Sequence, residues 1–117
     1  MNYYLPTNIH FGKGEALNEL EAIVKIYNPK NIFLISGRNF IKNTGLLDKI
    51  LSRLNNYNII TYDRVNPSPQ LKDVNDALLK AEECNAELII GLGGGSVLDT
   101  GKIVSVMMNR KESILDY

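Results

Sequence analysis

Three consecutive glycines and a serine follow directly on an apolar run in this sequence. The run covers residues 88–92, and Gly93, Gly94, Gly95 and Ser96 come next. Because glycine has no Cβ, its backbone adopts turns that other residues avoid and lets a ligand come close to its N–H groups. A helix that starts after such a loop directs its unpaired amides and the positive end of its dipole to the same place. The junction therefore predicts a phosphate-binding site.

The spacing of these residues separates the loop from two common glycine motifs. A Walker A loop needs a glycine where Ser96 stands and a hydroxyl residue where Ile103 stands. A strict Rossmann fingerprint that begins at Gly91 needs its third glycine at Ser96, and one that begins at Gly93 needs it at Leu98. Both motifs are excluded in their strict form.

The pattern GGGSxxDxxK at residues 93–102 resembles the iron-containing (group III) alcohol dehydrogenase family. Two further segments are similar to the same family in the expected order: residues 6–14, which end in Phe-Gly-Lys-Gly, and the Asn-Pro-Ser-Pro loop at residues 66–69. The resemblance implies that the glycine-serine loop holds the pyrophosphate of NAD or NADP. It also implies that Asn66 and Asp99 contact this cofactor.

The resemblance extends over essentially the whole chain, but it covers only the front part of such an enzyme. It implies a Rossmann-like parallel α/β domain of the dehydroquinate synthase type, with an extended N-terminal strand, spanning residues 1–117 and cut short at its C-terminal end. In the family, a helical C-terminal domain holds the catalytic divalent metal, iron or zinc, with an aspartate and three histidines. That domain is absent here, so the chain alone is expected to be inactive.

The whole enzyme implied by this resemblance moves a hydride between a small alcohol or aldehyde and NAD(P). Family members often pair through the opening strand, which makes a homodimer an open alternative. A glycerol, glycerol-phosphate dehydrogenase or dehydroquinate synthase-type enzyme shares the GGGxxxD region and is one rival interpretation. A non-catalytic nucleotide- or phosphate-binding module is the other.

Gly37 and Arg38 follow the apolar run at residues 32–36, where many members of the resembled family have an acid that binds the adenosine ribose. That acid is absent here. Glycine leaves room, and the planar, permanently charged guanidinium of Arg38 suits a phosphate. We therefore expect a preference for NADP over NAD. The alternative is an ordinary turn with Arg38 in solvent.

Ser96 and Asp99 also fit a purely structural pattern. A serine followed three residues later by an acid is typical of a capping box, with Ser96 as the N-cap of the helix. Three glycines exceed what a cap requires, so we expect the amides of Gly94, Gly95 and Ser96 to bind pyrophosphate as well. Lys102, one helical turn further on, is either a solvated charge or a second phosphate partner.

The apolar residues around these motifs alternate between short runs and helical stripes. The extended segments are expected near residues 9–12, 32–35, 59–62 and 88–92, with helices between them. Continuous apolar runs are typical of parallel strands covered on both faces, and the alternation predicts a parallel sheet with right-handed crossovers. Such sheets bind ligands at the carboxyl ends of their strands. The three loops that carry the motifs are therefore expected on one rim.

The last predicted helix, from about residue 97 to 108, is apolar around more than one face. Its apolar residues include Ile103, Val104, Val106, Met107 and Met108. A helix that is apolar nearly all round has to be covered. Little sequence remains to cover this one, so the expected partner is C-terminal protein or another subunit.

Composition excludes several other classes of function. The 117 residues suit one domain, and 13 basic residues balance 13 acidic ones, so no net field favours nucleic acid or an anionic membrane as a partner. No apolar stretch approaches the roughly 20 residues of a membrane span. The N-terminus lacks a signal-peptide pattern, and a cytoplasmic location is expected.

The chain has one cysteine and one histidine. Cys84 has no second cysteine to pair with, and its place on an amphipathic helix predicts a reduced structural thiol. His10 lies in the opening strand, where alternation with Ile9 and Phe11 predicts an exposed side chain. No cluster with metal-ligand spacing is present in the sequence.

Overall fold

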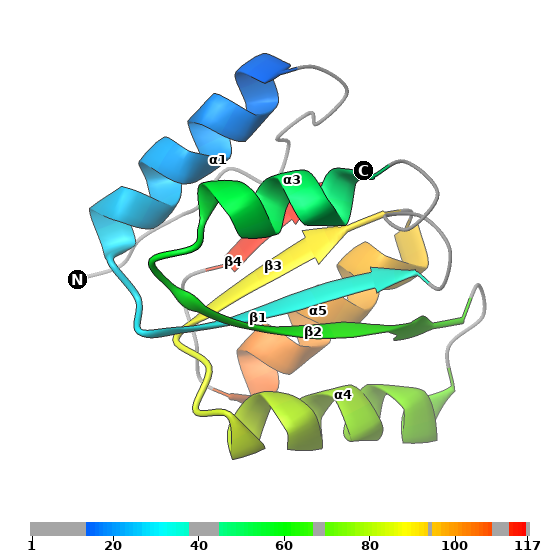
Figure 1. The fold of residues 1–117 in the computed structure, drawn as a ribbon. Coiled ribbons are helices and arrows are strands. Elements are labelled where there is room, and N and C mark those ends of the chain that lie inside the picture. The colour runs from blue at the N-terminus through cyan, green and yellow to red at the C-terminus, as the bar shows by residue number, and fades with distance from the viewer. Residues whose placement is uncertain (1–13, 38–44, 67–69, 94, 109–112, 117) are drawn as a thin grey trace.

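The computed structural model describes residues 14–37, 45–66, 70–93, 95–108 and 113–116 (Figure 1). The helices and strands, in chain order, are α1 (Gly14–Tyr27), β1 (Asn31–Gly37), α3 (Leu46–Arg53), β2 (Asn58–Val65), α4 (Leu71–Glu83), β3 (Leu88–Leu92), α5 (Gly95–Met107) and β4 (Ser113–Asp116). The opening strand predicted near residues 9–12 and His10 lie outside the described residues.

Within the described ranges, four strands form one parallel sheet in the order β2-β1-β3-β4. Ile32 of β1 pairs with Ile59 of β2 on one side and with Leu88 of β3 on the other. The parallel α/β fold expected from the alternating pattern is therefore confirmed. The strands β1, β2 and β3 also lie where the apolar runs predicted them.

The fourth strand, β4, was not predicted from the sequence. It adds to the free edge of β3, where Ile89 pairs with Ser113 and Leu92 pairs with Asp116. Its apolar part is only Ile114 and Leu115, which is too short to give a periodic signal. The strand exists because the edge of β3 offers hydrogen-bonding groups to a segment that the fold brings alongside.

Side chains alternate between the two faces of the sheet and build one apolar core on each face. Helices α1 and α3 lie on one side of the sheet, and α4 and α5 lie on the other (Figure 1). On β1, Ile32 and Leu34 pack with α1 and α3, whereas Phe33 and Ile35 pack on the side of α4 and α5; all four are fully buried. A strand that is buried on both faces needs a continuous run of apolar residues. This is why the sequence predicts β1 and β3 directly.

Two asparagines turn the chain from a helix back toward the sheet. Asn28 follows α1 with φ 44°, and Asn85 follows α4 with φ 54°. Asparagine tolerates this left-handed conformation better than most residues with a side chain, and it is a common helix terminator for that reason. These turns fix where β1 and β3 begin.

The outer side of α5 carries exposed apolar residues, as the sequence predicted for this helix. Val106 and Met107 lie three and four residues after Ile103, and the three side chains are 71%, 60% and 45% exposed, respectively. Val104, in contrast, is fully buried against the sheet. None of the helices in the described ranges has the length and apolar character needed to cross a bilayer.

Candidate functional site at the sheet rim

The register of the sheet brings the carboxyl ends of its strands to one edge, which we call the rim. Gly37 at the end of β1 pairs with Val65 at the end of β2, and Ser36 pairs with Leu92 at the end of β3. Asn66 and Gly93 are the next residues after β2 and β3. The prediction that the three motif-bearing loops leave one rim is confirmed for the parts of those loops that the structure describes.

Gly93 makes the sharp turn between β3 and α5, and its position requires glycine for two reasons. Its φ is +144°, a conformation that residues with a Cβ rarely adopt. A Cβ at this position would also lie 3.0 Å from Cγ2 of Val97 and 3.8 Å from the backbone nitrogen of Gly37. The turn therefore brings two strand ends and the first turn of a helix within van der Waals distance of one another.

Helix α5 begins at Gly95, so Ser96 is not its N-cap as the sequence pattern suggested. Ser96 lies inside the first turn, where its carbonyl accepts a hydrogen bond from Oγ1 of Thr100 at 2.8 Å. Asp99 then falls outside the first turn, and the predicted capping box does not form at these two positions. The turn at Gly93 and the packing of Val97 start the helix earlier than local capping preference does.

The first turn of α5 offers amide groups and open space. The first amides of a helix have no acceptor within the helix itself, and in α5 they include those of Gly95 and Ser96. A Cβ on Gly95 would find nothing within 4 Å, so the space beside this residue is empty. Gly94, the other predicted phosphate-binding glycine, lies outside the described residues. The described part of the junction thus fits an anion such as pyrophosphate.

Asp99 and Lys102 follow Ser96 at three-residue spacing along α5, and both are exposed. Asp99 is a neighbour of Ser96 on the helix surface and Lys102 is a neighbour of Asp99, because residues three apart lie close together on a helix. Asp99 is therefore on the side of α5 that starts at the candidate phosphate site. The choice between a solvated Lys102 and a phosphate partner is left open by its exposure.

Asn66 lies at the rim but already has an internal partner. Its Nδ2 donates to Oδ2 of Asp73 at 3.4 Å, and the same oxygen accepts a hydrogen bond from the backbone N–H of Gln70 at 2.8 Å. Gln70 and Asp73 form the capping box of α4. The side-chain amide of Asn66 is thus tied to the start of α4, which leaves Oδ1 and the second Nδ2 hydrogen for a ligand.

Gly37 has room for a side chain, whereas Arg38 lies outside the described residues. A Cβ on Gly37 would be 3.9 Å from Cγ2 of Val97, an ordinary contact distance. The position would therefore accept an acidic residue of the kind expected at an NAD site. The carboxyl end of β4 at Asp116 also reaches the rim, next to Leu92. In the sequence, Asp116 follows only a two-residue Ile-Leu run, which is too short to predict a strand.

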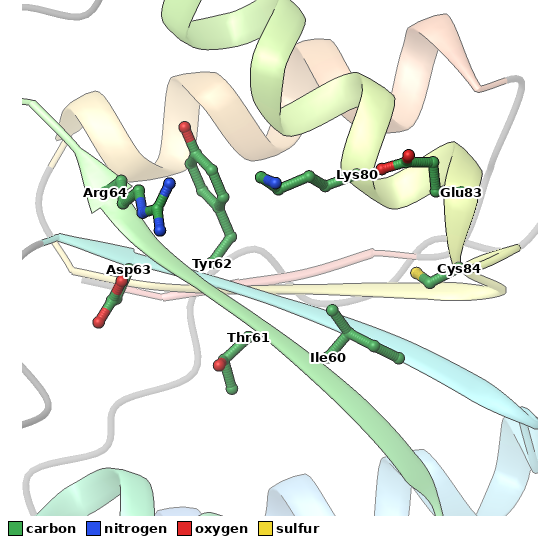
Figure 2. A pocket seen from close by; sticks show the side chains of 8 residues that line it. All are labelled: Ile60, Thr61, Tyr62, Asp63, Arg64, Lys80, Glu83 and Cys84. Atoms are coloured by element: carbon green, nitrogen blue, oxygen red, sulfur yellow. The ribbon is translucent and has the colours of Figure 1, made fainter.

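A separate cavity of about 400 Å³ lies along β2, an outer strand of the described sheet, beside the last turns of α4 (Figure 2). It is lined by Ile60, Thr61, Tyr62, Asp63, Arg64, Lys80, Glu83 and Cys84. The sequence analysis predicted no site there. The lining has as many acidic as basic side chains, so charge does not select one kind of ligand.

Two groups beside this cavity have raised pKa values, and structure explains both. Burial, together with a 3.0 Å hydrogen bond from the hydroxyl of Tyr62 to Oδ2 of Asp76, raises the pKa of Tyr62 to about 12. Burial raises the pKa of the Cys84 thiol, whose Sγ lies 3.3 Å from the carbonyl oxygen of Ala81. A thiol with a raised pKa is a weak nucleophile, which supports the structural role predicted for Cys84.

No group of three or more histidine, cysteine, aspartate or glutamate side chains that could hold a metal ion occurs among residues 14–37, 45–66, 70–93, 95–108 and 113–116. The donor set that iron or zinc requires is therefore not offered by this part of the chain. At the described rim, the first amides of α5 are groups that suit an anion.

Comparison with known proteins identifies relatives of this chain. The model of the iron-containing alcohol dehydrogenase family matches residues 6–117. The chain is 33% identical over 105 residues to a probable NADH-dependent butanol dehydrogenase 1 of Bacillus subtilis, covering 88% of this chain and 27% of that protein. It is 29% identical over 113 residues to the NADPH-dependent aldehyde reductase YqhD of Escherichia coli, covering 97% of this chain and 28% of that protein.

The fold agrees with the same family. The crystal structure of NADH-dependent butanol dehydrogenase A from Thermotoga maritima superposes with a TM-score of 0.74 and 28% sequence identity, over 90% of this chain and 27% of that one. The chain thus spans a little more than a quarter of the length of these relatives. Because the family model matches nearly the whole sequence, the chain belongs to the iron-containing alcohol dehydrogenase family.

Proposed function

We propose that residues 1–117 are the N-terminal dinucleotide-binding part of an NAD(P)-dependent, metal-dependent alcohol dehydrogenase. The whole enzyme would move a hydride between a small alcohol or aldehyde and the nicotinamide. Relatives named as butanol dehydrogenases and as an aldehyde reductase support this substrate class. Metal binding would belong to the part of the relatives that this chain does not match, so the chain alone would not turn over substrate.

One observation carries the proposal: the glycine turn leaves open space beside the first amides of α5. Gly93 adopts a φ suited to glycine, and nothing lies within 4 Å of a Cβ placed on Gly95. Backbone amides at a helix N-terminus, with the positive end of the helix dipole behind them, bind phosphate well. Gly94, Gly95 and Ser96 would therefore hold the pyrophosphate, with Asp99 and Asn66 contacting the nicotinamide side of the cofactor.

The bound nicotinamide would supply the hydride chemistry, and the residues of this chain would supply position. Rigid placement of the cofactor matters because a reaction between two held groups avoids the entropic cost of bringing them together. The rim is suited to this task, because β1 and β3 are buried on both faces and cannot shift without disturbing both cores. The pyrophosphate would thus be fixed to the most rigid part of the fold.

The proposed pyrophosphate site can be tested by placing a negative charge in the empty space beside Gly95. Gly95→Asp puts a carboxylate beside the first amides of α5, where it competes with the pyrophosphate and repels it. We expect NADPH and NADH affinity to fall more than about tenfold, or about 1.4 kcal/mol. The measurement is a fluorescence titration of reduced dinucleotide into the 117-residue chain.

The same substitution should not lower the melting temperature, because an acidic residue in the first turn of a helix interacts favourably with its dipole. The matched control is Gly95→Ala, whose Cβ meets nothing within 4 Å and should leave binding nearly unchanged. Unaltered affinity in Gly95→Asp, or no dinucleotide binding by the wild-type chain, would refute the proposed site.

Cofactor choice belongs to the same proposal. We expect NADP to be preferred, because no acid stands at Gly37 and the permanently charged Arg38 follows it. The relatives include proteins named for NADH and for NADPH, so relatedness supports neither cofactor over the other. The space beside Gly37 makes a direct test available.

Gly37→Asp introduces the carboxylate that repels a 2′-phosphate, while its Cβ makes only an ordinary contact with Val97. NADPH affinity should fall about tenfold while NADH affinity is retained or rises. Gly37→Ala controls for the added Cβ and should change neither affinity. Equal affinities of the wild-type chain for both cofactors would contradict the preference.

A further inference from the structure

Val97 occupies an unusual position between the ends of two neighbouring strands. Its Cγ2 lies 3.0 Å from the place where a Cβ of Gly93 would stand and 3.9 Å from the corresponding place at Gly37. The strands β1 and β3 that end at these glycines are directly paired, with Ser36 opposite Leu92. A single methyl group thus packs into the notch formed by two glycine backbones.

The helix geometry explains why this side chain reaches back to the loop. Side chains on a helix lean toward its N-terminus, and Val97 is the third residue of α5. It is 3% exposed and belongs to the same apolar cluster as Phe33 and Ile35 of β1. Because a β-branched valine in a helix is held to one main χ1 rotamer, its Cγ2 has little freedom to leave the notch.

We propose that Val97 is a positioning residue for dinucleotide binding. Its Cγ2 sets the distance between the Gly37 end of β1 and the Gly93 turn, and it thereby fixes the direction of the amides at Gly95 and Ser96. Val97 makes no bond to the ligand in this scheme. The ligand-binding part of this inference rests on the proposed dinucleotide site, whereas the effect of Val97 on the loop does not.

A matched pair of substitutions separates positioning from packing. Val97→Ala and Val104→Ala delete the same two methyl groups from buried residues of the same helix and the same apolar cluster. Val104 lies seven residues further along α5, about two turns from the glycine turn. Both variants should lose similar stability in a denaturant titration, but only Val97→Ala should disturb the rim.

Two readouts are measured on the 117-residue chain for each variant. Fluorescence titration with NADPH should show at least about tenfold weaker binding in Val97→Ala and less than about twofold change in Val104→Ala. Amide NMR without ligand should show shifted Gly95 and Ser96 signals in Val97→Ala alone. If the wild-type chain binds no dinucleotide, the proposed function fails, and the amide signals still decide the role of Val97.

Two further variants keep the inference testable if Val97→Ala does not fold. Val97→Leu keeps an apolar side chain but loses the branch at Cβ whose methyl group fills the notch, so it should weaken NADPH binding. Val97→Thr keeps the branched shape and should restore affinity to within about threefold of wild type. Equal losses in the two alanine variants, unshifted Gly95 and Ser96 signals, or wild-type binding by Val97→Leu would overturn the inference.

Discussion

The rim and the cavity at the edge of β2 differ in what they offer to a ligand. The rim presents backbone amides, glycines and empty space, with Gly93 and Gly95 making room where other residues would place a Cβ. The edge cavity presents side chains of mixed charge, including Arg64, Lys80 and Glu83 (Figure 2). The edge cavity is therefore not the place where we propose that the dinucleotide binds.

A phosphate site of the proposed kind, at the end of a parallel strand, need not be a deep pocket. Preorganised amides at a helix N-terminus bind an anion through direction and charge, so enclosure is not required. A cavity along an edge strand, in contrast, arises wherever a helix does not fully cover the free side of that strand.

The largest expected effect on stability and binding comes from adding a Cβ to Gly93, in the tight turn at the rim. Gly93→Ala places a Cβ 3.0 Å from Val97 in a backbone with φ +144°. Strain and overpacking together should cost about 3 kcal/mol of unfolding free energy, and dinucleotide binding should be lost. Chemical denaturation and NADPH titration measure the two effects.

Gly37→Ala is the control for this prediction, because its Cβ would lie 3.9 Å from Val97. It should leave both the unfolding free energy and binding close to wild type. If Gly93→Ala behaved like Gly37→Ala, the rim would not depend on the tight turn that distinguishes it from the edge cavity.

The next effect concerns the edge cavity at high pH. Because the pKa of Tyr62 is raised to about 12 in the folded state from 10.0, folding favours the protonated phenol. The stabilisation is complete below pH 10 and is lost as the pH rises toward 12, at up to about 1.4 kcal/mol per pH unit. Unfolding free energy measured from pH 9 to 12 should fall accordingly.

Tyr62→Phe removes the titrating group and should abolish this contribution to the alkaline loss of stability. At neutral pH the same variant loses the hydrogen bond to Asp76, which should cost about 1 kcal/mol. Dinucleotide affinity at neutral pH should not change. An alkaline stability profile identical in both proteins would show that Tyr62 titrates normally.

The smallest effect is expected from the cations of the edge cavity. Arg64→Ala combined with Lys80→Ala removes both basic side chains from its lining. Dinucleotide affinity should change less than about twofold, because the cofactor is expected at the rim and exposed charges contribute little. A tenfold loss of NADPH binding in the double variant would move the candidate site from the rim to the edge cavity.

The buried strands were predictable because a strand that is buried on both faces needs a continuous run of apolar residues. The runs at β1 and β3 are continuous and apolar, and both strands are buried along almost their whole length. The apolar part of β4 is only two residues long and forms no such run, and the pairing of β4 depends on the edge of β3. A short edge strand is decided by its neighbour and not by its own composition.

The candidate site also has some features that the sequence predicts and others that it does not. Gly37, Gly95 and Asn66 could be identified from motifs and from the ends of predicted strands, and their meeting at one rim followed from the parallel order. The start of α5 could not be predicted, because the capping pattern at Ser96 and Asp99 competes with a tight turn at Gly93. Local capping contributes about 1 kcal/mol, which is less than the cost of displacing a buried side chain such as Val97.

The sequence by itself determined the alternation of strands and helices, the glycine junction and the family. Each of these depends only on which residues occur in a segment and on how they are spaced. The tertiary structure decided that Val97 packs between the ends of β1 and β3, that Asn66 is tied to α4, and that β4 extends the sheet. These facts depend on contacts between residues far apart in the chain. Such contacts arise only when the two cores close around the sheet, and no single segment encodes them.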